Sequence, residues 1–369
     1  LVLVIAGVLG GIAALFGSAP REPDEPLTPR HMDLAASVQR VTEDVVLALT
    51  RALARETGQT RLCMAGGVAL NCVANGRILR DKAFAEVWVQ PAAGDAGGAL
   101  GAAFAAHHGM LQRPRPAPPA GDAMAGSYLG PEFSLSDVET ALRQAGARYE
   151  VLADAALYAQ VAQALAAGRT VGWVQGRMEF GPRALGNRSI LADARSPEMQ
   201  RRLNLQVKFR ESFRPFAPAV LAEDAAEWFQ MDRASPYMLF VAELLTPHRR
   251  PLSAGHEAFT GLERLGLERS TIPAATHVDY SARVQTVHRE TNARFHALLT
   301  EFKRITGCPV LVNTSFNIRG EPIVCTPADA YRCFMRCDID LLVVGNCRLL
   351  KSEQPASARR RESTVYAPD

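Results

Sequence analysis

The sequence predicts an α/β fold in two globular regions, and three observations support this. Strand-like segments that run into glycine loops and then into helices occur twice before residue 113. A proline- and alanine-rich stretch covers residues 113–121, where repeated proline disfavours both helix and sheet pairing. Beyond this stretch, helical and strand-like segments alternate again up to residue 350. The chain of 369 residues has room for two domains of ordinary size.

The first region is expected to hold three helices and two strands. Apolar residues recur at helical spacing from Met32 to Glu56, which predicts one long helix. The next elements are, in order, a strand that runs into Gly66-Gly67, a helix through Leu70 and Val73, a strand at 86–90, a loop at 91–98 and a helix to His108.

The second region is expected to alternate helices and strands. The predicted helices are 136–145, 155–167, 196–205, 292–306 and 327–337, and the predicted strands are 170–174, 308–312 and 341–344. Residues 207–209 are expected to be extended, and residues 351–369 to form a loose tail.

Composition and cysteine usage are those of an ordinary globular protein. A net charge of +3 is too small to argue for a nucleic-acid or membrane partner. Seven cysteines without a Cys-x-x-Cys pair indicate reduced thiols in a cytoplasmic protein. The uncharged segment Leu1–Phe16 is too short for a membrane span and has no basic stretch before it. We therefore expect a chain whose true beginning is missing.

The segment from Arg177 to Arg214 is strongly basic. Nine basic residues stand against four acidic ones, a net charge of +5. Eight of the nine are arginines, whose planar fork suits phosphate and carboxylate oxygens. Glycines and prolines interrupt the segment, which places the arginines on turns rather than along one solvated helix. The alternative is a basic surface paired with acidic neighbours, and we favour an anion pocket.

Lys208, Arg210 and Arg214 are expected to line this anion pocket. Lys208 and Arg210 are two residues apart, so both would point the same way on an extended segment. Arg214 lies in the sequence Phe213-Arg-Pro-Phe216, where aromatic and proline neighbours fix the backbone.

A second polar cluster, Asn313 to Asn317, follows the apolar strand predicted at 308–312. Ser315 and Asn317 would share one face there, at the end of a strand, where α/β sheets usually bind ligands. Asn and Ser are also common turn formers, so this signal is weak by itself.

Two glycine loops in the first region have features of ligand sites. Gly66-Gly67 leads into a helix and so offers backbone N–H groups and a positive helix end to phosphate. Asn71 and Asn75, one helical turn apart, would then be near a ribose or base. Asp95 lies among glycines, either as a metal ligand or as the more common helix cap. Without clustered carboxylates or a His-x-x-x-His pair, we expect no tight metal site in this chain.

Six segments together resemble one family, the O-carbamoyltransferases of nodulation-factor and antibiotic biosynthesis. The segments are residues 62–75 (LCMAGGVALNCVAN), 94–98 (GDAGG), 176–190 (GRMEFGPRALGNRSI), 208–218 (KFRESFRPFAP), 283–287 (RVQTV) and 313–317 (NTSFN). The likeness extends from about Phe16 to Leu350.

The resemblance implies two domains and a two-step reaction. Residues 1–112 would be the C-terminal portion of an actin/heat-shock ATPase/sugar-kinase type domain, residues 113–126 a linker, and residues 127–350 a YrdC-like α/β domain. The YrdC-like domain would make carbamoyl adenylate from carbamoyl phosphate and ATP, with Mg. The actin-like domain would pass the carbamoyl group to a hydroxyl of a sugar or natural product, with iron or another divalent metal bound.

Particular residues match the motifs of this family. Lys208, Arg210, Arg214, Arg283 and Ser315 match the carbamoyl phosphate and ATP site, Gly66, Gly67 and Asn71 match the nucleotide loop, Asn317 is a further cofactor-binding candidate, and Asp95 matches a metal-ligand position.

The chain departs from the family pattern near its start. Nothing matches the paired metal-binding histidines of the family, so the resemblance implies an N-terminally truncated enzyme. Three alternatives stay open: a carbamoyl-adenylate enzyme of hydrogenase maturation or tRNA threonylcarbamoylation, an inactive fragment, and a nucleic-acid-binding module in which Phe209, Phe213 and Phe216 would stack bases. The favoured interpretation has neither nucleic acid nor membrane as a partner, and leaves the acceptor and the oligomeric state open.

Overall fold

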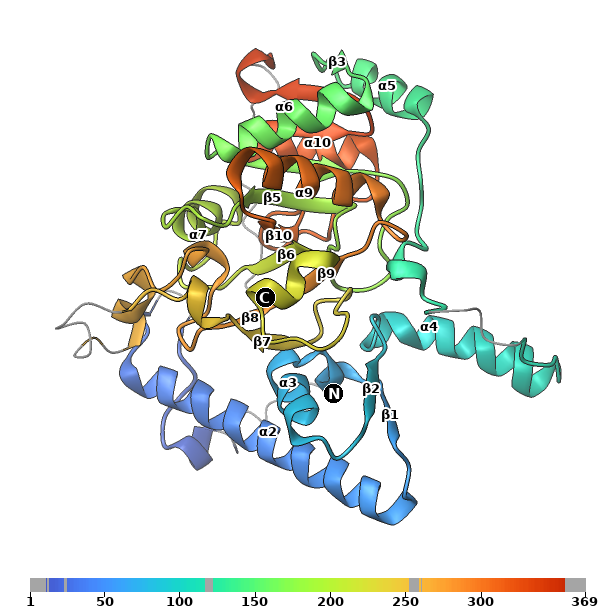
Figure 1. The fold of residues 1–369 in the computed structure, drawn as a ribbon, viewed down its shortest axis with the longest axis vertical. Coiled ribbons are helices and arrows are strands. Elements are labelled where there is room, and N and C mark those ends of the chain that lie inside the picture. Colours follow the sequence, from blue (N-terminus) through green and yellow to red (C-terminus); the bar gives the residue numbers. More distant parts are fainter. Residues whose placement is uncertain are drawn as a thin grey trace.

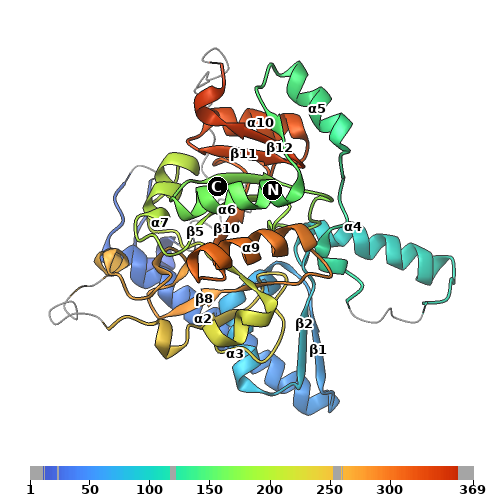
Figure 2. The ribbon, with the colours of Figure 1, turned by 45° about the horizontal axis from the view of Figure 1, so that its top comes forward.

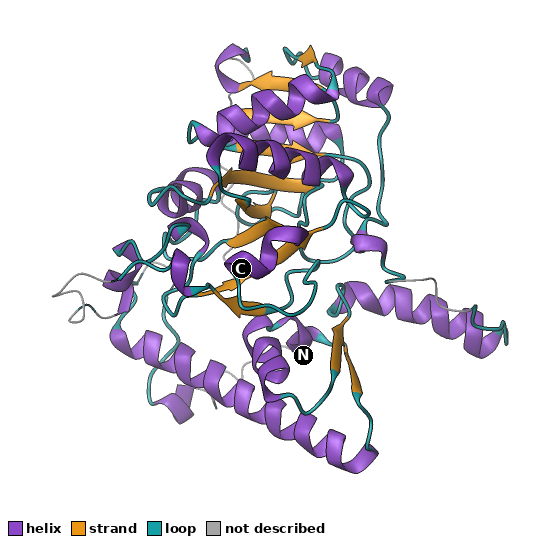
Figure 3. Ribbon diagram, in the orientation of Figure 1, coloured by secondary structure: helices purple, strands orange, loops and turns teal. Residues whose placement is uncertain are grey.

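The computed structural model describes residues 13–22, 25–116, 122–251 and 261–355, with the single positions 11 and 259. Within these residues the predicted α/β class is confirmed. Figure 1 shows the C-terminal region as a stack of strands covered by helices, and the N-terminal region as helices beside a two-stranded ribbon. The same division stands out when the ribbon is coloured by secondary structure (Figure 3). None of the described helices is both long enough and apolar enough to cross a bilayer.

An eight-stranded mixed sheet forms the centre of the C-terminal region. Its strands lie in the order β3-β12-β11-β4-β5-β10-β6-β9. Neighbouring strands are antiparallel except for two parallel pairs, β11 with β4 and β6 with β9. The strands are β3 (Glu150–Val151), β4 (Val171–Val174), β5 (Arg188–Asp193), β6 (Ala217–Leu221), β9 (Gln285–Val287), β10 (Val310–Ser315), β11 (Leu341–Val344) and β12 (Cys347–Leu350).

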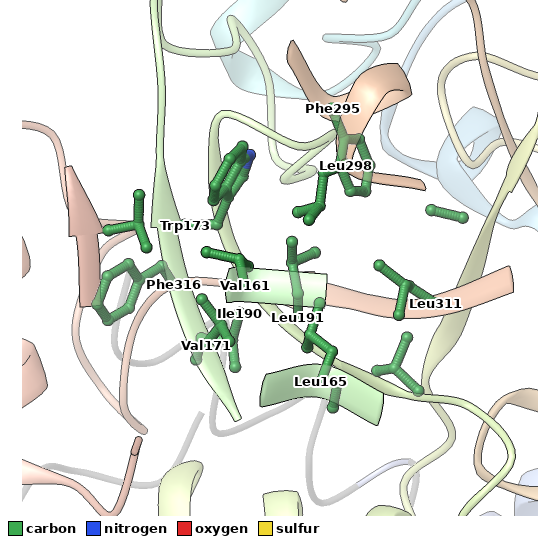
Figure 4. Packing of buried hydrophobic residues seen from close by; sticks show 14 of the residues in the cluster. Val161, Leu165, Val171, Trp173, Ile190, Leu191, Phe295, Leu298, Leu311 and Phe316 are labelled. Carbon is green, nitrogen blue, oxygen red and sulfur yellow. The ribbon is translucent and has the colours of Figure 1, made fainter. Parts of the chain in front are cut away.

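Helices cover both faces of this sheet. On one face α6 (Asp154–Ala166) packs against α9 (Ala293–Thr306), and on the other α10 (Pro327–Arg336) lies against β11 and β4, beside α5 (Leu135–Gln144) (Figures 1 and 2). Every residue of β4 and β5 is buried, as expected for strands covered on two sides. In the close-up of this core, Trp173 of β4 lies on the same side of the sheet as Phe295 and Leu298 of α9 (Figure 4).

The N-terminal region contains the two predicted strand–loop–helix units. A long helix, α2 (Pro29–Thr57), precedes β1 (Arg61–Met64), α3 (Cys72–Asp81), β2 (Glu86–Val89) and α4 (Asp95–Phe104). The two strands pair in parallel. A π-helical turn extends α4 to Met110, no residue of α4 is buried, and both views show this helix projecting from the body (Figures 1 and 2).

The two regions share a second hydrophobic core. Leu62 and Val87 of the N-terminal strands belong to the same buried cluster as Leu185, Ala217 and Met238. Helix α3 also packs on β7 (Val241–Glu243), which pairs with β8 (Ser281–Arg283). Contacts therefore cross the boundary predicted at residues 113–126.

Most predicted helices and strands are confirmed to within a few residues, but the ends of two predicted segments differ. Met124 is buried in the second core, so the last part of the predicted linker is packed, while residues 117–121 lie outside the described residues. Gln354 is buried and bonds to the backbone of Arg148, so the predicted loose tail begins with a short turn at Lys351–Glu353 that is followed by a packed residue. Residues 356–369 of that tail lie outside the described residues.

Two local predictions need correction, and several strands of the C-terminal region, β5 and β6 among them, were not predicted. Pro218 lies inside β6, a position where proline normally argues against a strand. The helix predicted at 196–205 is α7 (Met199–Arg202) followed by a π-helical turn at Leu203–Val207. The expectation that residues 207–209 are extended is wrong, because this turn buries Leu203 and Val207 against the sheet.

Candidate functional site

Lys208 is directed into the protein by the turn that precedes it. The π-helical turn ends at Val207, Lys208 keeps a helical backbone, and Phe209 adopts a left-handed φ of 50°. The chain reverses there, and Lys208 becomes almost fully buried. Lys208 is therefore positioned by a helical turn, not by the extended segment that the sequence predicted.

The Lys208 ammonium lies in a hydrogen-bonded cluster at the end of β10. Its Nζ donates to Ser315 Oγ at 3.1 Å, to Asn317 Oδ1 at 2.8 Å, and to the backbone carbonyls of both residues. Ser315 Oγ donates to Asn317 Oδ1 at 2.7 Å. Burial, with Arg210 nearby, lowers the pKa of Lys208 to about 7. The predicted pair Ser315 and Asn317 does lie together, with Lys208 bridging it.

Two adjoining cavities of about 370 Å³ and 140 Å³ open beside this cluster. Arg210, Arg214 and Ser315 line both of them. Lys208 lines the smaller cavity and Arg283 the larger. The structure thus brings together the five residues predicted for one anion site.

The larger cavity is strongly cationic. Arg183, Arg210, Arg214 and Arg283 line it, and no Asp or Glu is among its described lining residues. Burial, with Arg183 and Arg210 nearby, lowers the pKa of Arg283 to about 10, and burial also lowers the pKa of Arg183. Guanidinium groups stay protonated in proteins, so these lowered pKa values result from repulsion between the arginines and from their loss of hydration. A bound anion would offset both effects.

Neighbouring side chains fix two of these arginines. Arg210 Nε donates to Asn204 Oδ1 at 2.8 Å, and its guanidinium stacks 5.2 Å above the Phe216 ring. Arg214 Nε donates to Glu211 at 3.1 Å, and Asn204 Nδ2 donates to the Arg214 carbonyl at 2.9 Å. Phe216 is buried under Arg210, which disfavours the alternative in which it stacks nucleic-acid bases.

Other arginines of the basic segment have structural roles. Arg188 is fully buried and donates to backbone carbonyls such as those of Gln175 and Cys325. Arg195 and Arg202 form ion pairs with Asp193 and Asp340. The net charge of +5 therefore overstated the number of cations available to a ligand.

The residues predicted for the nucleotide loop are separate from both cavities. The N–H of Gly66 donates to the Ala93 carbonyl, and Gly67 is exposed. Asn71 caps α3 by accepting from the Ala74 amide and also bonds to Gln39, so its side chain is already engaged. Instead, the first residues of α3, Cys72 and Val73, line the larger cavity, so the N-terminus of this helix, which is the positive end of its dipole, lies beside the cavity.

Asp95 is the first residue of α4 and is exposed. An acidic residue in the first turn is favourable to the helix dipole, which is a sufficient structural reason for it. No group of three or more His, Cys, Asp or Glu side chains within the described ranges lies close enough together to hold a metal ion. The described residues therefore do not fit a metal centre at Asp95.

Sequence reasoning missed two residues of the larger cavity, Arg183 and His277. Arg183 belongs to the basic segment, but nothing in the sequence separates it from Arg188, which has a structural role. His277 lies outside every segment that the sequence singled out, and only the turn before β8 brings it beside Arg283.

The fold and this site define an α/β protein with an open cationic cavity whose described lining residues come from both regions and include no Asp or Glu. The chain belongs to the carbamoyltransferase family: the model described as Carbamoyltransferase C-terminus matches residues 162–351, and the model described as Carbamoyltransferase N-terminus matches residues 6–104. The second match begins at residue 6, so most of the segment Leu1–Phe16 follows the family pattern rather than departing from it.

Curated relatives agree with this family. An uncharacterized protein of Synechocystis, sll1178, is 56% identical over 93% of this chain and 56% of its own length. Nodulation protein NolO of Bradyrhizobium diazoefficiens is 42% identical over 94% of this chain and 59% of its own length. The 3'-hydroxymethylcephem-O-carbamoyltransferase of Streptomyces clavuligerus is 38% identical over 78% of this chain and 48% of its own length. The chain thus spans about half the length of these relatives.

Proposed function

We propose that this chain activates a carbamoyl group as part of an ATP-dependent O-carbamoyltransferase. Carbamoyl phosphate and ATP, with Mg, bind in the two adjoining cavities and react with water to give carbamoyl adenylate, phosphate and pyrophosphate. The carbamoyl group then passes to a hydroxyl of a sugar or natural product. The C-terminal sheet region would be the YrdC-like domain, and residues 1–112 part of an actin-like domain.

The observation that carries the proposal is the convergence of Lys208, Arg183, Arg210, Arg214 and Arg283 around the two cavities. No Asp or Glu is among the described lining residues of the larger cavity, and Glu321 is the one carboxylate among those of the smaller cavity. Joining carbamoyl phosphate to ATP brings several negative groups together, and fixed positive side chains offset their repulsion and align them. Adenylation also creates a good leaving group, so the reaction needs no nucleophilic side chain.

Acceptor transfer rests on the relatives. The cephem enzyme of Streptomyces clavuligerus is named for O-carbamoylation of a hydroxymethyl group, which supports a small-molecule hydroxyl as the acceptor. The iron or other divalent metal that the resemblance implies does not fit the described residues, so no step of this proposal depends on it.

The test is carbamoyl phosphate-dependent exchange of pyrophosphate into ATP by the full 369-residue chain. Arg214→Ala removes charge-assisted hydrogen bonds to the anion and should lower carbamoyl phosphate affinity roughly 10- to 100-fold. Arg201→Ala is the matched control, because Arg201 is exposed in the same basic segment and lines neither cavity. Absence of exchange in the soluble wild-type chain, or equal affinity in both variants, would contradict the proposal.

A further inference from the structure

His277 differs chemically from the four arginines that line the larger cavity. The four arginines there can only donate hydrogen bonds. A neutral imidazole has one nitrogen that donates and one that accepts. His277 can therefore recognise a ligand group that carries its own N–H or O–H.

The turn before β8 fixes the His277 ring. The His277 amide donates to the Ser281 carbonyl at 2.8 Å, and the Tyr280 amide donates to the His277 carbonyl at 3.1 Å. Ring nitrogen Nδ1 lies 2.9 Å from Ser281 Oγ. Two residues beyond Ser281 on the same strand, Arg283 lines the cavity together with His277.

The surroundings of Ser281 favour one tautomer of the ring. The Ser281 amide donates to Asp279 Oδ1 at 3.0 Å, and the amide and hydroxyl of Ser281 hold the pKa of Asp279 below its ordinary value although burial alone would raise it. In the tautomer that this arrangement favours, the Ser281 hydroxyl turns its proton toward the Asp279 carboxylate and accepts from Nδ1–H of His277. The acceptor nitrogen of the neutral ring is then Nε2.

Nε2 is the part of the ring left for a ligand. No hydrogen bond joins it to any residue in the described part of the chain, although His277 is one of the residues that line the cavity. Burial, with Arg283 and Arg269 nearby, lowers the pKa of His277 despite the attraction of Asp279. The ring is therefore neutral near pH 7 and offers a lone pair among guanidinium groups.

We propose that His277 Nε2 accepts a hydrogen bond from the amide NH₂ of carbamoyl phosphate and so determines specificity for the carbamoyl group. This inference rests on the proposed function. The arginines bind the phosphate and the carbonyl oxygen of any acyl phosphate equally well. Acetyl phosphate has a methyl group where carbamoyl phosphate has NH₂, so only the carbamoyl compound satisfies Nε2.

The test compares carbamoyl phosphate with acetyl phosphate by calorimetry on the full chain. The wild-type protein should bind fresh carbamoyl phosphate about tenfold more tightly than acetyl phosphate, because the acetyl compound leaves the acceptor nitrogen unpaired. His277→Leu should bring the two affinities together, and His277→Gln, which keeps an acceptor at similar reach, should restore part of the preference. Inorganic phosphate should bind all three proteins equally, which shows that the arginines remain in place.

The possible outcomes distinguish a failure of the specificity role of His277 from a failure of the proposed function. Equal binding of both acyl phosphates by the wild type, or an unchanged preference in His277→Leu, overturns the specificity role and leaves the anion site standing. If the wild type binds neither acyl phosphate, the proposed function fails and the specificity role fails with it. Should His277→Leu not fold, the preferences of the wild type and of His277→Gln still give the answer.

Discussion

Lys208 is a buried amine whose charge depends on what occupies the neighbouring cavity. Its four hydrogen-bond acceptors are neutral oxygens of Ser315 and Asn317, and no described carboxylate pairs with it. Burial and Arg210 hold its pKa at about 7, so the unliganded protein is half protonated there at neutral pH. An anion in the smaller cavity favours the ammonium form and raises this pKa.

Binding of carbamoyl phosphate should therefore take up a proton at Lys208 above pH 7. Below that pH the amine is already charged, and affinity should change little. Above it, affinity should fall by up to about tenfold per pH unit, because one pKa unit corresponds to about 1.4 kcal/mol. Calorimetry at pH 8 in two buffers of different ionisation enthalpy should show uptake of close to one proton. Lys208→Met should abolish that uptake; an identical proton count in both proteins would exclude Lys208 as its source.

At the residue scale, sequence motifs identified residues that lie together in the structure, but the backbone geometry predicted for them was wrong. The sequence singled out Lys208, Arg214 and Ser315, which the structure brings to adjoining cavities. The reasoning that paired Lys208 with Arg210 on an extended segment was wrong, because periodicity does not reveal a π-helical turn followed by a left-handed residue. His277 could not be predicted, since its place in the cavity depends on a turn and on tertiary contacts.

Among the secondary-structure elements, α2 shows that helical spacing predicts a helix without identifying its packed face. Of the apolar residues that recur along it, Leu47 is buried, whereas Val38, Val41, Val45 and Leu49 are each more than half exposed. The buried positions are Glu43, Leu47 and Thr50. Polar contacts hold this side against α3, including one from Arg77 to Glu43 at 2.8 Å. Amphipathic spacing identifies a helix, but it does not say which side meets a neighbour.

Leu47 and Leu49 make a matched pair on this helix. Leu47 is 6% exposed and Leu49 64% exposed, two residues apart. Leu47→Ala should lower the free energy of unfolding by about 2–5 kcal/mol, because it leaves a cavity in the second core. Leu49→Ala should change it by less than about 0.5 kcal/mol. Urea unfolding followed by circular dichroism measures both, and equal losses would mean that the exposed side of α2 is packed.

Across the whole molecule, the larger cavity depends on how the two regions are joined. Its wall includes Cys72 and Val73 from the start of α3, together with Arg283 from β8. Asn75 of α3 is fully buried and donates to the Leu239 carbonyl at 3.0 Å. The sequence placed the whole anion site in residues 127–350, because local patterns cannot show that a distant helix completes a cavity. A protein cut at residue 127 would lose this wall.

Gly76 is where α3 approaches the strands most closely. A Cβ added there would lie 2.6 Å from Val241 Cγ2 and 3.0 Å from the Val241 carbonyl oxygen, so helix or strand would have to move. Val241 of β7 is the register partner of Arg283 on β8, so a displaced Val241 would move the arginine that lines the cavity.

Gly76→Ala should therefore weaken anion binding from a position outside the cavity. We expect a loss of about 1–3 kcal/mol in stability from overpacking, and several-fold weaker binding of inorganic phosphate because Cys72 and Arg283 move apart. Gly101→Ala in α4 is the control: apart from its chain neighbours and the backbone of its own helix, no described atom lies within 4 Å of the added Cβ, and alanine favours a helix. This control should keep wild-type phosphate affinity and lose no stability. Thermal unfolding measures the loss of stability, and calorimetry measures phosphate binding. If Gly76→Ala is destabilised but binds phosphate as tightly as the wild type does, the packing between the two regions does not shape the cavity.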